Sequence, residues 1–191
     1  MRASSQSIWA TRSNRTSWQD FTAGLPNFVW LTDVTQFLIS ADKLYFCSAL
    51  DCFDGSIVSW TTSAFSNAET ASSMLQAAIR LTRPSERAHL IIHSDCKCHY
   101  RWDGWISICK EADITRSMSR KGCLPDNSCR EGFFGTMKNE MFYGRDWEGA
   151  SLDELRQKID GYIEWYNTKR IKHSLGSMSP LAYRQSLALA A

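Results

Sequence analysis

Three acidic residues lie where the surrounding sequence favours buried or helical structure. Asp33 interrupts an apolar run, Asp95 ends another, and Glu131 lies early in a helical pattern, with 35 residues between the last two. A carboxylate that leaves water costs several kcal/mol unless a cation compensates it. Taken singly, each acid could serve as a turn former or a helix cap. Together they predict a site for two hard cations such as Mg²⁺, about 4 Å apart, which activate a hydroxyl and stabilise a leaving oxygen.

The helix that carries Glu131 presents a polar strip beside its apolar face. At about 100° per residue, Asn127, Glu131, Gly135 and Lys138 fall within roughly 40° of one another. Glycine lets a phosphate backbone approach closely, and a lysine can meet its charge. We therefore expect this strip to face a phosphate backbone.

Clustered cations near the acids extend this prediction. Basic residues often form a solvated face, but their closeness to the acids favours a phosphate-binding rim. The predicted DNA contacts are Lys138, Arg120, Lys121, Asn127, Lys169 and Arg170.

Two other chemistries are weaker. His93, Cys96, Cys98 and His99 lie within seven residues and could suggest zinc, but no second ligand pair follows at zinc-finger spacing. Cys96 could be a nucleophile, but no third group that would orient a base is evident.

The elements that must position the acids form an α/β pattern. The run 28–39 is apolar on both parities, as in a strand covered on both faces. Strands are expected at 28–39, 44–50, 56–62, 89–93 and 114–117, the third after an Asp54-Gly55 turn. Helices are expected after a Ser66/Glu69 capping box, from Asp103 through Ala112, after Asp126 or Asn127, from Ser151 (with Glu154) to about Thr168, and after Ser179-Pro180. The order predicts a mixed five-stranded sheet, an antiparallel meander plus parallel strands, flanked by helices.

Composition sets limits on location and partners. The chain has 191 residues, 43% of them hydrophobic, and a net charge of +2, so a basic surface requires local clustering. Seven cysteines without a CxxC pair and no leader pattern predict reduced thiols in a cytoplasmic protein. No apolar run reaches the roughly 18 to 20 residues of a membrane span. Residues 1–20 are expected to be a disordered or linker lead.

Five sequence blocks carry a resemblance to a known family. They are PNFVWLTDVTQF, IIHSD with HYRW, ITRSMSRKG, PDNSCREGFFGTMKNE and IEWYNTKRIKHSLGSMSPLAY. In order and spacing they resemble the catalytic half of DDE transposases of insertion sequence family three, relatives of retroviral integrases. The resemblance covers about 21–187, and the 35-residue acid interval matches that family's.

The resemblance implies an RNase H-like fold with an integrase catalytic core at 21–145 and a C-terminal helical extension at 146–191. It implies Mg²⁺- or Mn²⁺-dependent DNA cleavage and strand transfer, with Asp33, Asp95 and Glu131 as catalytic metal ligands for two ions. The implied partners are transposon ends and target DNA, with a homo-oligomer assembled on DNA, no membrane, and association with the bacterial nucleoid when DNA is bound.

One departure leaves alternatives open. Where the family usually has a glycine-containing pair after the second acid, this chain has Cys96-Lys97. An inactive remnant that binds DNA or its parent transposase is therefore an alternative, and an RNase H-like nuclease without strand transfer is another.

Overall fold

The computed structural model describes residues 23–95, 98–118 and 128–187, together with the side chains of these residues except 128–131. The predicted lead at 1–20, Cys96-Lys97 and the cap candidates Asp126 and Asn127 lie outside the described residues. No helix among those described is long and apolar enough to cross a membrane.

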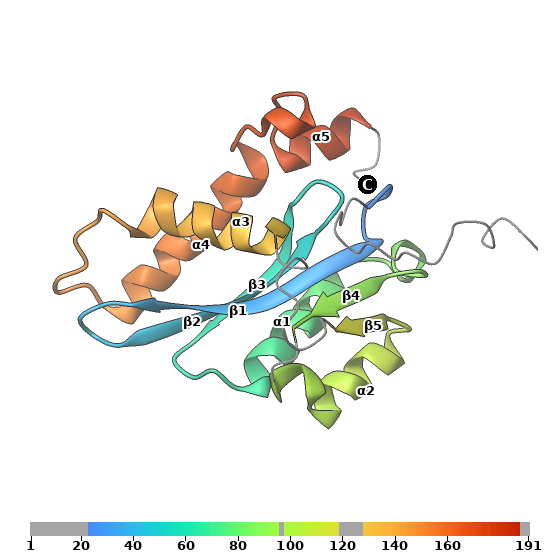
Figure 1. The fold of residues 1–191 in the computed structure, drawn as a ribbon, viewed down its shortest axis with the longest axis horizontal. Helices are drawn as coiled ribbons and strands as arrows, with labels where there is room; N and C mark the ends of the chain where they lie inside the picture. The colour runs from blue at the N-terminus through green and yellow to red at the C-terminus, as the bar shows by residue number, and fades with distance from the viewer. Residues whose placement is uncertain (1–22, 96–97, 119–127, 188–191) are drawn as a thin grey trace, which may run out of the picture.

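A five-stranded mixed sheet forms the centre of the molecule (Figure 1). Its strands are β1 (Val29–Leu38), β2 (Lys43–Asp51), β3 (Ile57–Ser63), β4 (Ile91–Ser94) and β5 (Thr115–Met118), in the spatial order β3-β2-β1-β4-β5. The first three strands pair antiparallel, whereas β4 runs parallel to both β1 and β5. The predicted meander with parallel strands is confirmed.

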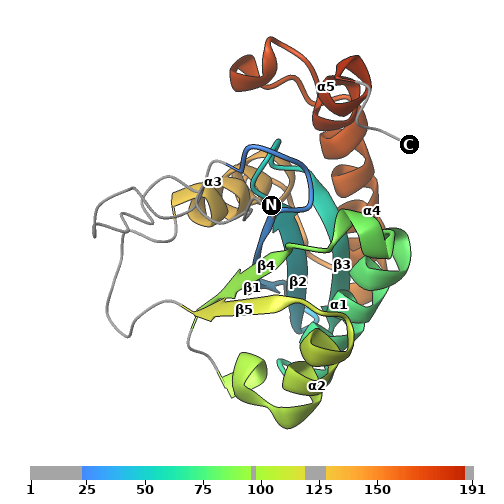
Figure 2. The same cartoon turned by 90° about the vertical axis from the view of Figure 1, so that its right-hand side faces the viewer.

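Helices cover both faces of the sheet (Figure 2). Helices α1 (Ala68–Leu81) and α2 (Asp103–Glu111) pack on one face, and α3 (Ser128–Met137) and α4 (Leu152–Thr168) on the other. Helix α5 (Pro180–Ser186) follows α4. Short 3₁₀ turns occupy Pro84–Glu86, Cys98–Arg101 and His173–Leu175, and a π-helical segment at Lys138–Phe142 continues α3.

Strand β1 shows why two hydrophobic cores exist. Trp30 is fully buried in the core beneath α1 and α2, whereas Leu31 and Phe37 are buried beneath α3 and α4. Successive side chains of a strand point to opposite faces, so an apolar run on both parities needs cover on both sides. The strand predicted at 28–39 is therefore confirmed in character and, within a residue at each end, in extent.

Two predicted helix caps are wrong by one residue. The N-cap of α1 is Asn67, whose side chain accepts from the Thr70 amide, whereas the Ser66 hydroxyl contacts His99 Nε2 at 3.2 Å. Both residue types cap well, and the tertiary contact of Ser66 leaves the cap to Asn67. At α2 the N-cap position is Trp102, without a side-chain hydrogen bond, and Asp103 lies in the first turn. An acid there still interacts favourably with the helix dipole.

The capping box at the start of α4 is confirmed. Ser151 Oγ accepts from the Glu154 amide, and Glu154 accepts from the Ser151 amide at 2.7 Å. Ser179 caps α5 as predicted, with Pro180 in its first turn. Gly176 ends the preceding turn in the left-handed conformation, with a φ of 65°. Glycine adopts this conformation without strain because it has no Cβ.

Candidate active site

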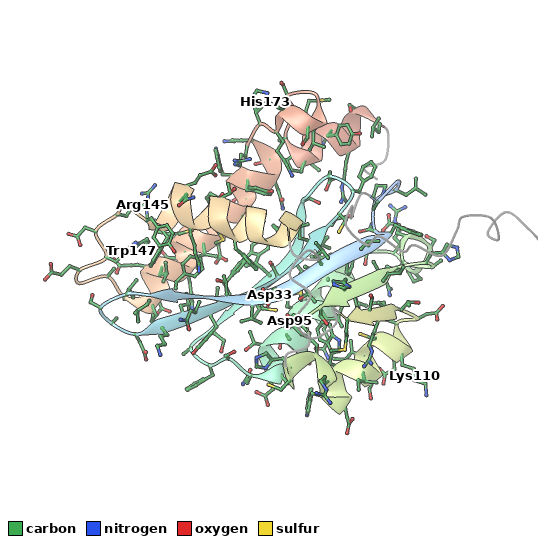
Figure 3. The ribbon with its side chains drawn as sticks, in the orientation of Figure 1. Asp33, Asp95, Lys110, Arg145, Trp147 and His173 are labelled. Atoms are coloured by element: carbon green, nitrogen blue, oxygen red, sulfur yellow. The ribbon has the colours of Figure 1, made fainter. Side chains whose placement is uncertain are left out.

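Asp33 and Asp95 lie next to each other where the pairing of the two inner strands β1 and β4 ends. In the parallel pairing of β1 and β4, the last paired residues are Thr32 and Ser94, and each acid is the next residue of its chain. Neighbouring strands lie about 4.8 Å apart. Asp33 lies within β1 and Asp95 directly follows β4, so the two acids lie side by side, as Figure 3 shows, and both are half-buried.

The side-chain alternation of β1 places Asp33 on the face covered by α3. Leu31 and Phe37 share its parity and belong to the core that contains α3 and α4. Helix α3 packs on this face through Phe134, whose ring lies 6.0 Å from that of Phe46 on β2. Glu131 belongs to α3, and its side chain lies outside the described residues. The backbone thus brings the helix of the third acid over the face from which Asp33 projects.

A buried tyrosine hydroxyl lies close to both acids. Tyr100 is 1% exposed, and its Oη lies 3.3 Å from Thr32 Oγ1. Its pKa is raised well above the ordinary value, first by burial and then by nearby Cys47, with further increases from the carboxylates of Asp33 and Asp95. The phenol therefore stays neutral. Asp33 and Asp95, which are remote in sequence, both raise the pKa of this one hydroxyl.

The residues considered for zinc have other contacts. His93 is buried, with Nδ1 3.0 Å from Ser117 Oγ on the neighbouring strand, and His99 contacts Ser66 and Cys98. Cys96 lies outside the described residues. Across the part of the chain that the structure describes, no three His, Cys, Asp or Glu side chains group closely enough to hold a metal ion. Of the three acids predicted to hold a metal, the described side chains include those of Asp33 and Asp95.

The predicted DNA contacts differ in their surroundings. Lys138 Nζ lies 5.6 Å from the centre of the Phe37 ring, and burial lowers the pKa of this lysine. Lys169 is exposed at the end of α4. The Arg170 guanidinium pairs with the Glu140 carboxylate. The remaining three, Arg120, Lys121 and Asn127, lie outside the described residues.

The C-terminal segment contains structural residues that sequence reasoning did not assign. The Asn167 side chain accepts from the Ile57 amide and donates to the Ile57 carbonyl, both at 2.9 Å, as a neighbouring strand would. Lys172 Nζ donates to the Asp54 carbonyl at 2.8 Å. The sequence signal was the Tyr166-Asn167 to Ser179-Pro180 block itself, but its partners lie more than a hundred residues earlier.

An arginine completes this attachment. Arg184 on α5 donates to Asp51 Oδ2 at 2.6 Å and to Ser56 Oγ at 2.9 Å, and it also pairs with Asp54. The Asp51 and Asp54 side chains are fully buried. The pKa of Asp51 is raised, because burial outweighs the stabilising Arg184 charge. The C-terminal helices are thus fixed to the β2–β3 turn.

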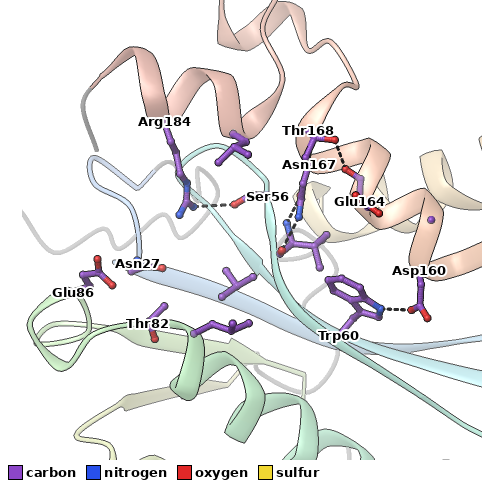
Figure 4. Close-up of a pocket in the computed structure, with 15 residues that line it drawn as sticks. Asn27, Ser56, Trp60, Thr82, Glu86, Asp160, Glu164, Asn167, Thr168 and Arg184 are labelled. Atoms are coloured by element: carbon purple, nitrogen blue, oxygen red, sulfur yellow. Dashed lines mark hydrogen bonds between the residues drawn. The ribbon is translucent and has the colours of Figure 1, made fainter. Parts of the chain in front are cut away.

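A pocket of about 620 Å³ lies beside β3, between α1, α4 and α5 (Figure 4). Its wall combines apolar Val58 and Leu181 with the acids Glu86, Asp160 and Glu164. Acidic walls repel phosphate, so this pocket is poorly suited to DNA. The acids Asp33 and Asp95 do not line it.

Known proteins match nearly the whole chain. Residues 24–123 match an integrase core domain model, and residues 131–187 match a second model of the same description. The chain belongs to the integrase core family. Its predicted membership of the DDE transposases of insertion sequence family three is confirmed by its curated relatives.

Three relatives illustrate this membership. The chain is 48% identical over 171 residues to a probable transposase for insertion sequence element IS1353 of Shigella flexneri, covering 90% of this chain and 33% of that protein. It is 38% identical over 166 residues to a putative transposase for insertion sequence element IS150 of Escherichia coli, covering 87% and 57%. It is 40% identical over 171 residues to an uncharacterized transposase-like protein of Haemophilus influenzae, covering 88% and 76%. This integrase core chain therefore spans a third of the first relative and just over half of the second.

Solved structures confirm the fold. The HTLV-2 integrase catalytic core domain in complex with magnesium, in its trimeric form, superposes with a TM-score of 0.65 at 19% identity, covering 83% of this chain and 97% of that one. The catalytic core domain of BIV integrase gives 0.61 at 16% identity, covering 85% and 97%. The RNase H-like integrase core architecture predicted from the sequence is confirmed.

Proposed function

We propose that this integrase core domain catalyses DNA strand cleavage and strand transfer in transposition, with Asp33, Asp95 and Glu131 as its catalytic acids. The observation that carries the proposal is the placement of Asp33 and Asp95 one residue beyond the last pair of two adjacent parallel strands. The relatives named as transposases support the reaction class, and α3, which carries Glu131, covers the same face.

The donor set fits a hard divalent cation. Two carboxylates, one within β1 and one directly after β4, with a third on the covering helix, provide oxygen ligands only, which is the preference of Mg²⁺ and Mn²⁺. When bound, two such ions would supply Lewis-acid stabilisation of the attacking and leaving oxygens. The magnesium complex of a retroviral integrase core of similar fold supports this assignment.

Side chains of the chain itself would hold and surround the metal ions. Asp33 and Asp95 are oriented by strands whose backbone is fixed by pairing on both sides. Tyr100 remains a neutral hydroxyl beneath them, within the core formed with α1 and α2. Lys138, at the start of the π-helical segment, would meet the phosphate backbone, and Lys169 would extend the DNA path.

The partners are proposed to be transposon ends and target DNA. Joining two ends requires at least two catalytic cores, so we expect a homo-oligomer on DNA. The residues Arg120, Lys121 and Asn127 precede Glu131 in the chain and are proposed as further DNA contacts. A protein with these partners would act in the cytoplasm at the nucleoid.

A cleavage assay tests the proposal. Asp95→Asn should lower Mg²⁺-dependent nicking and joining of a transposon-end duplex by at least about 100-fold, because losing even an outer partner of a metal ligand costs roughly 10 to 100-fold. Asp113→Asn is the matched control, since Asp113 is exposed, has a φ of 55°, and lies outside the site. Full activity of Asp95→Asn would refute the assignment.

The same assay separates the alternatives. Wild-type protein that shifts DNA without nicking it under Mg²⁺ or Mn²⁺ would be the inactive remnant. Cys96 and Lys97, where the family usually has a glycine-containing pair, would then be the first positions to replace with glycine. Nicking without joined products would indicate a nuclease.

A further inference from the structure

An aromatic contact holds helix α3 in place close to Glu131, the third predicted acid. Phe133 lies two residues after Glu131, and its ring is 5.0 Å from that of Tyr166 on α4, with the planes at 76°. Edge-to-face pairs of this kind are favourable beyond the area they bury. Both rings are buried, at 4% exposure. The segment that carries Glu131 is therefore packed directly against Tyr166, at the start of the Tyr166-Asn167 to Ser179-Pro180 block.

A second contact holds the π-helical continuation of α3. The Glu140 carboxylate accepts a hydrogen bond from Tyr162 Oη at 2.7 Å. It also accepts from Arg170 Nε at 3.0 Å and from Arg170 Nη2 at 2.7 Å. A bidentate guanidinium pair is stronger and more directional than a single hydrogen bond. The hydrogen bond from Arg170 lowers the pKa of Glu140, so the carboxylate is ionised at neutral pH.

The two contacts are joined through Tyr166. Arg170 Cζ lies 5.6 Å from the centre of the Tyr166 ring, and Lys172 Nζ lies 5.7 Å from it. Lys172 in turn donates to Asp54 on the β2–β3 turn. We call Phe133, Glu140, Tyr162, Tyr166 and Arg170 the α3 clamp. It connects α3 to the sheet through α4 and the segment that follows it.

Asp33 and Asp95 do not need such a device. Their strands are fixed by backbone pairing, whereas α3 contacts the sheet through side chains such as Phe134. The distance from Glu131 to the two strand acids therefore depends on how firmly α3 is held. A metal site tolerates little displacement, because ligand distances of roughly 2 Å must be met by all three acids at once.

We infer that the α3 clamp is a positioning device, in which Arg170 and Glu140 hold α3 where Glu131 completes the metal site with Asp33 and Asp95. This inference rests on the proposed function, since it assumes that the three acids share a metal. It assigns Arg170 a different role from the DNA contact expected from the sequence. Its guanidinium donates to Glu140, and this carboxylate neutralises the positive charge that would attract a DNA phosphate.

The two roles of Arg170 predict different effects of Glu140→Gln. A DNA-contacting Arg170 would be released by this substitution, and DNA binding would be unchanged or stronger. A clamping Arg170 would lose its partner, and metal binding would weaken although Glu140 itself is not a proposed metal ligand.

The test uses MgCl₂ alone, with thermal unfolding of the full chain as readout. Arg170→Ala and Glu140→Gln should each raise the Mg²⁺ dissociation constant about tenfold, which removes about 1.4 kcal/mol of Mg²⁺-dependent stabilisation at saturating metal. Arg156→Ala is the matched control, because Arg156 lies on α4 with two clamp residues and forms its ion pair with Asp153, an exposed acid. Wild-type Mg²⁺ affinity in both clamp variants would overturn the inference.

A charge swap guards against variants that fail to fold. Glu140→Arg combined with Arg170→Glu keeps the pair and should recover Mg²⁺ affinity to within about threefold of wild type. No recovery in a folded double variant would contradict the clamp.

Salt dependence of DNA binding provides the second readout. If Arg170 is a clamp residue, the slope of log K against log salt is the same for Arg170→Ala and wild type. A slope reduced by about 0.9 would mark a lost phosphate contact and overturn the inference. The proposed function fails separately, if wild-type protein and Asp95→Asn respond to MgCl₂ alike. The clamp alone fails if Asp95→Asn weakens the response to MgCl₂ while both clamp variants respond like wild type.

Discussion

Replacing Arg184 tests how the C-terminal helices are attached. Arg184→Met keeps the apolar part of the side chain but leaves the carboxylates of Asp51 and Asp54 without their cation. Both side chains are fully buried, whereas Arg184 is 17% exposed. Removing one partner of a buried ion pair typically costs about 3 to 5 kcal/mol, because a buried charge is left uncompensated. Domains of this kind have only about 5 to 15 kcal/mol of stability.

The acids retain some partners, which limits the loss. Asp51 still accepts from the amides of Asn27 and Phe53, and Asp54 from the amide of Ser56. We therefore expect about 3 kcal/mol, the lower end of that range, measured as the change in the free energy of unfolding in urea.

The pH dependence gives the sign of the effect. The pKa of Asp51 is already raised above 3.8 by burial, and removing the Arg184 charge must raise it further. An acid with a raised pKa in the folded state destabilises the protein as pH rises from the unfolded pKa through the folded one. The deficit of Arg184→Met should therefore shrink as pH is lowered from neutral toward about 4. Asp51→Asn together with Arg184→Met should remove much of this pH dependence.

A loss below about 1 kcal/mol at neutral pH, or a deficit that grows on acidification, would refute this reasoning. The first would mean that the buried acids do not depend on Arg184. The second would mean that Asp51 is more acidic in the folded protein than in the unfolded chain.

Individual contacts give three further predictions. Asn167→Leu leaves the Ile57 amide and carbonyl without their side-chain partner. It should cost about 2 kcal/mol in urea unfolding, and a loss under about 0.5 kcal/mol would contradict the strand-like role. Tyr100→Phe removes the hydroxyl that contacts Thr32 in a buried site. It should cost about 1 kcal/mol in the same measurement, and an unchanged stability would contradict the contact. Glu140 has a lowered pKa, so its contribution is present above its ordinary value of 4.5 and is lost as pH falls through the folded pKa. The stability difference between wild type and Glu140→Gln should therefore be flat through the neutral range and vanish at low pH.

The sheet could be predicted because its strands carry local signals. The run that became β1 is apolar on both parities, and this requires helices on both faces whatever the tertiary details. Asp54-Gly55 marked the turn before β3, and Gly55 adopts a φ of 71° there. The Ser151 and Glu154 capping box identified the start of α4 because both partners lie within one helical turn.

The errors arose where a distant residue decides a local choice. Ser66 and Asn67 are both good N-cap residues, and only the approach of His99 engages Ser66 elsewhere. The change to π-helical geometry at Lys138 likewise follows no local signal that we identified, and it ends the ideal phasing assumed for the polar strip.

The candidate site was partly predictable for the same reason. Asp33 and Asp95 were found as acids at unusual places in apolar runs, but their adjacency follows from the parallel register of β1 and β4, which is a tertiary property. Arg170 and Arg184 were visible only as positive charges. Their acidic partners, Glu140 and Asp51, lie 30 and 133 residues away.

Crystallography with Mn²⁺ tests the central claim most directly, because Mn²⁺ replaces Mg²⁺ at oxygen sites and scatters anomalously. The account predicts an anomalous peak at ligand distance, about 2.0 to 2.3 Å, from carboxylate oxygens of both Asp33 and Asp95, with Glu131 reaching the same ion or a second one about 4 Å away. A well-ordered structure in which Mn²⁺ binds elsewhere, and Asp33 and Asp95 point apart, would contradict it.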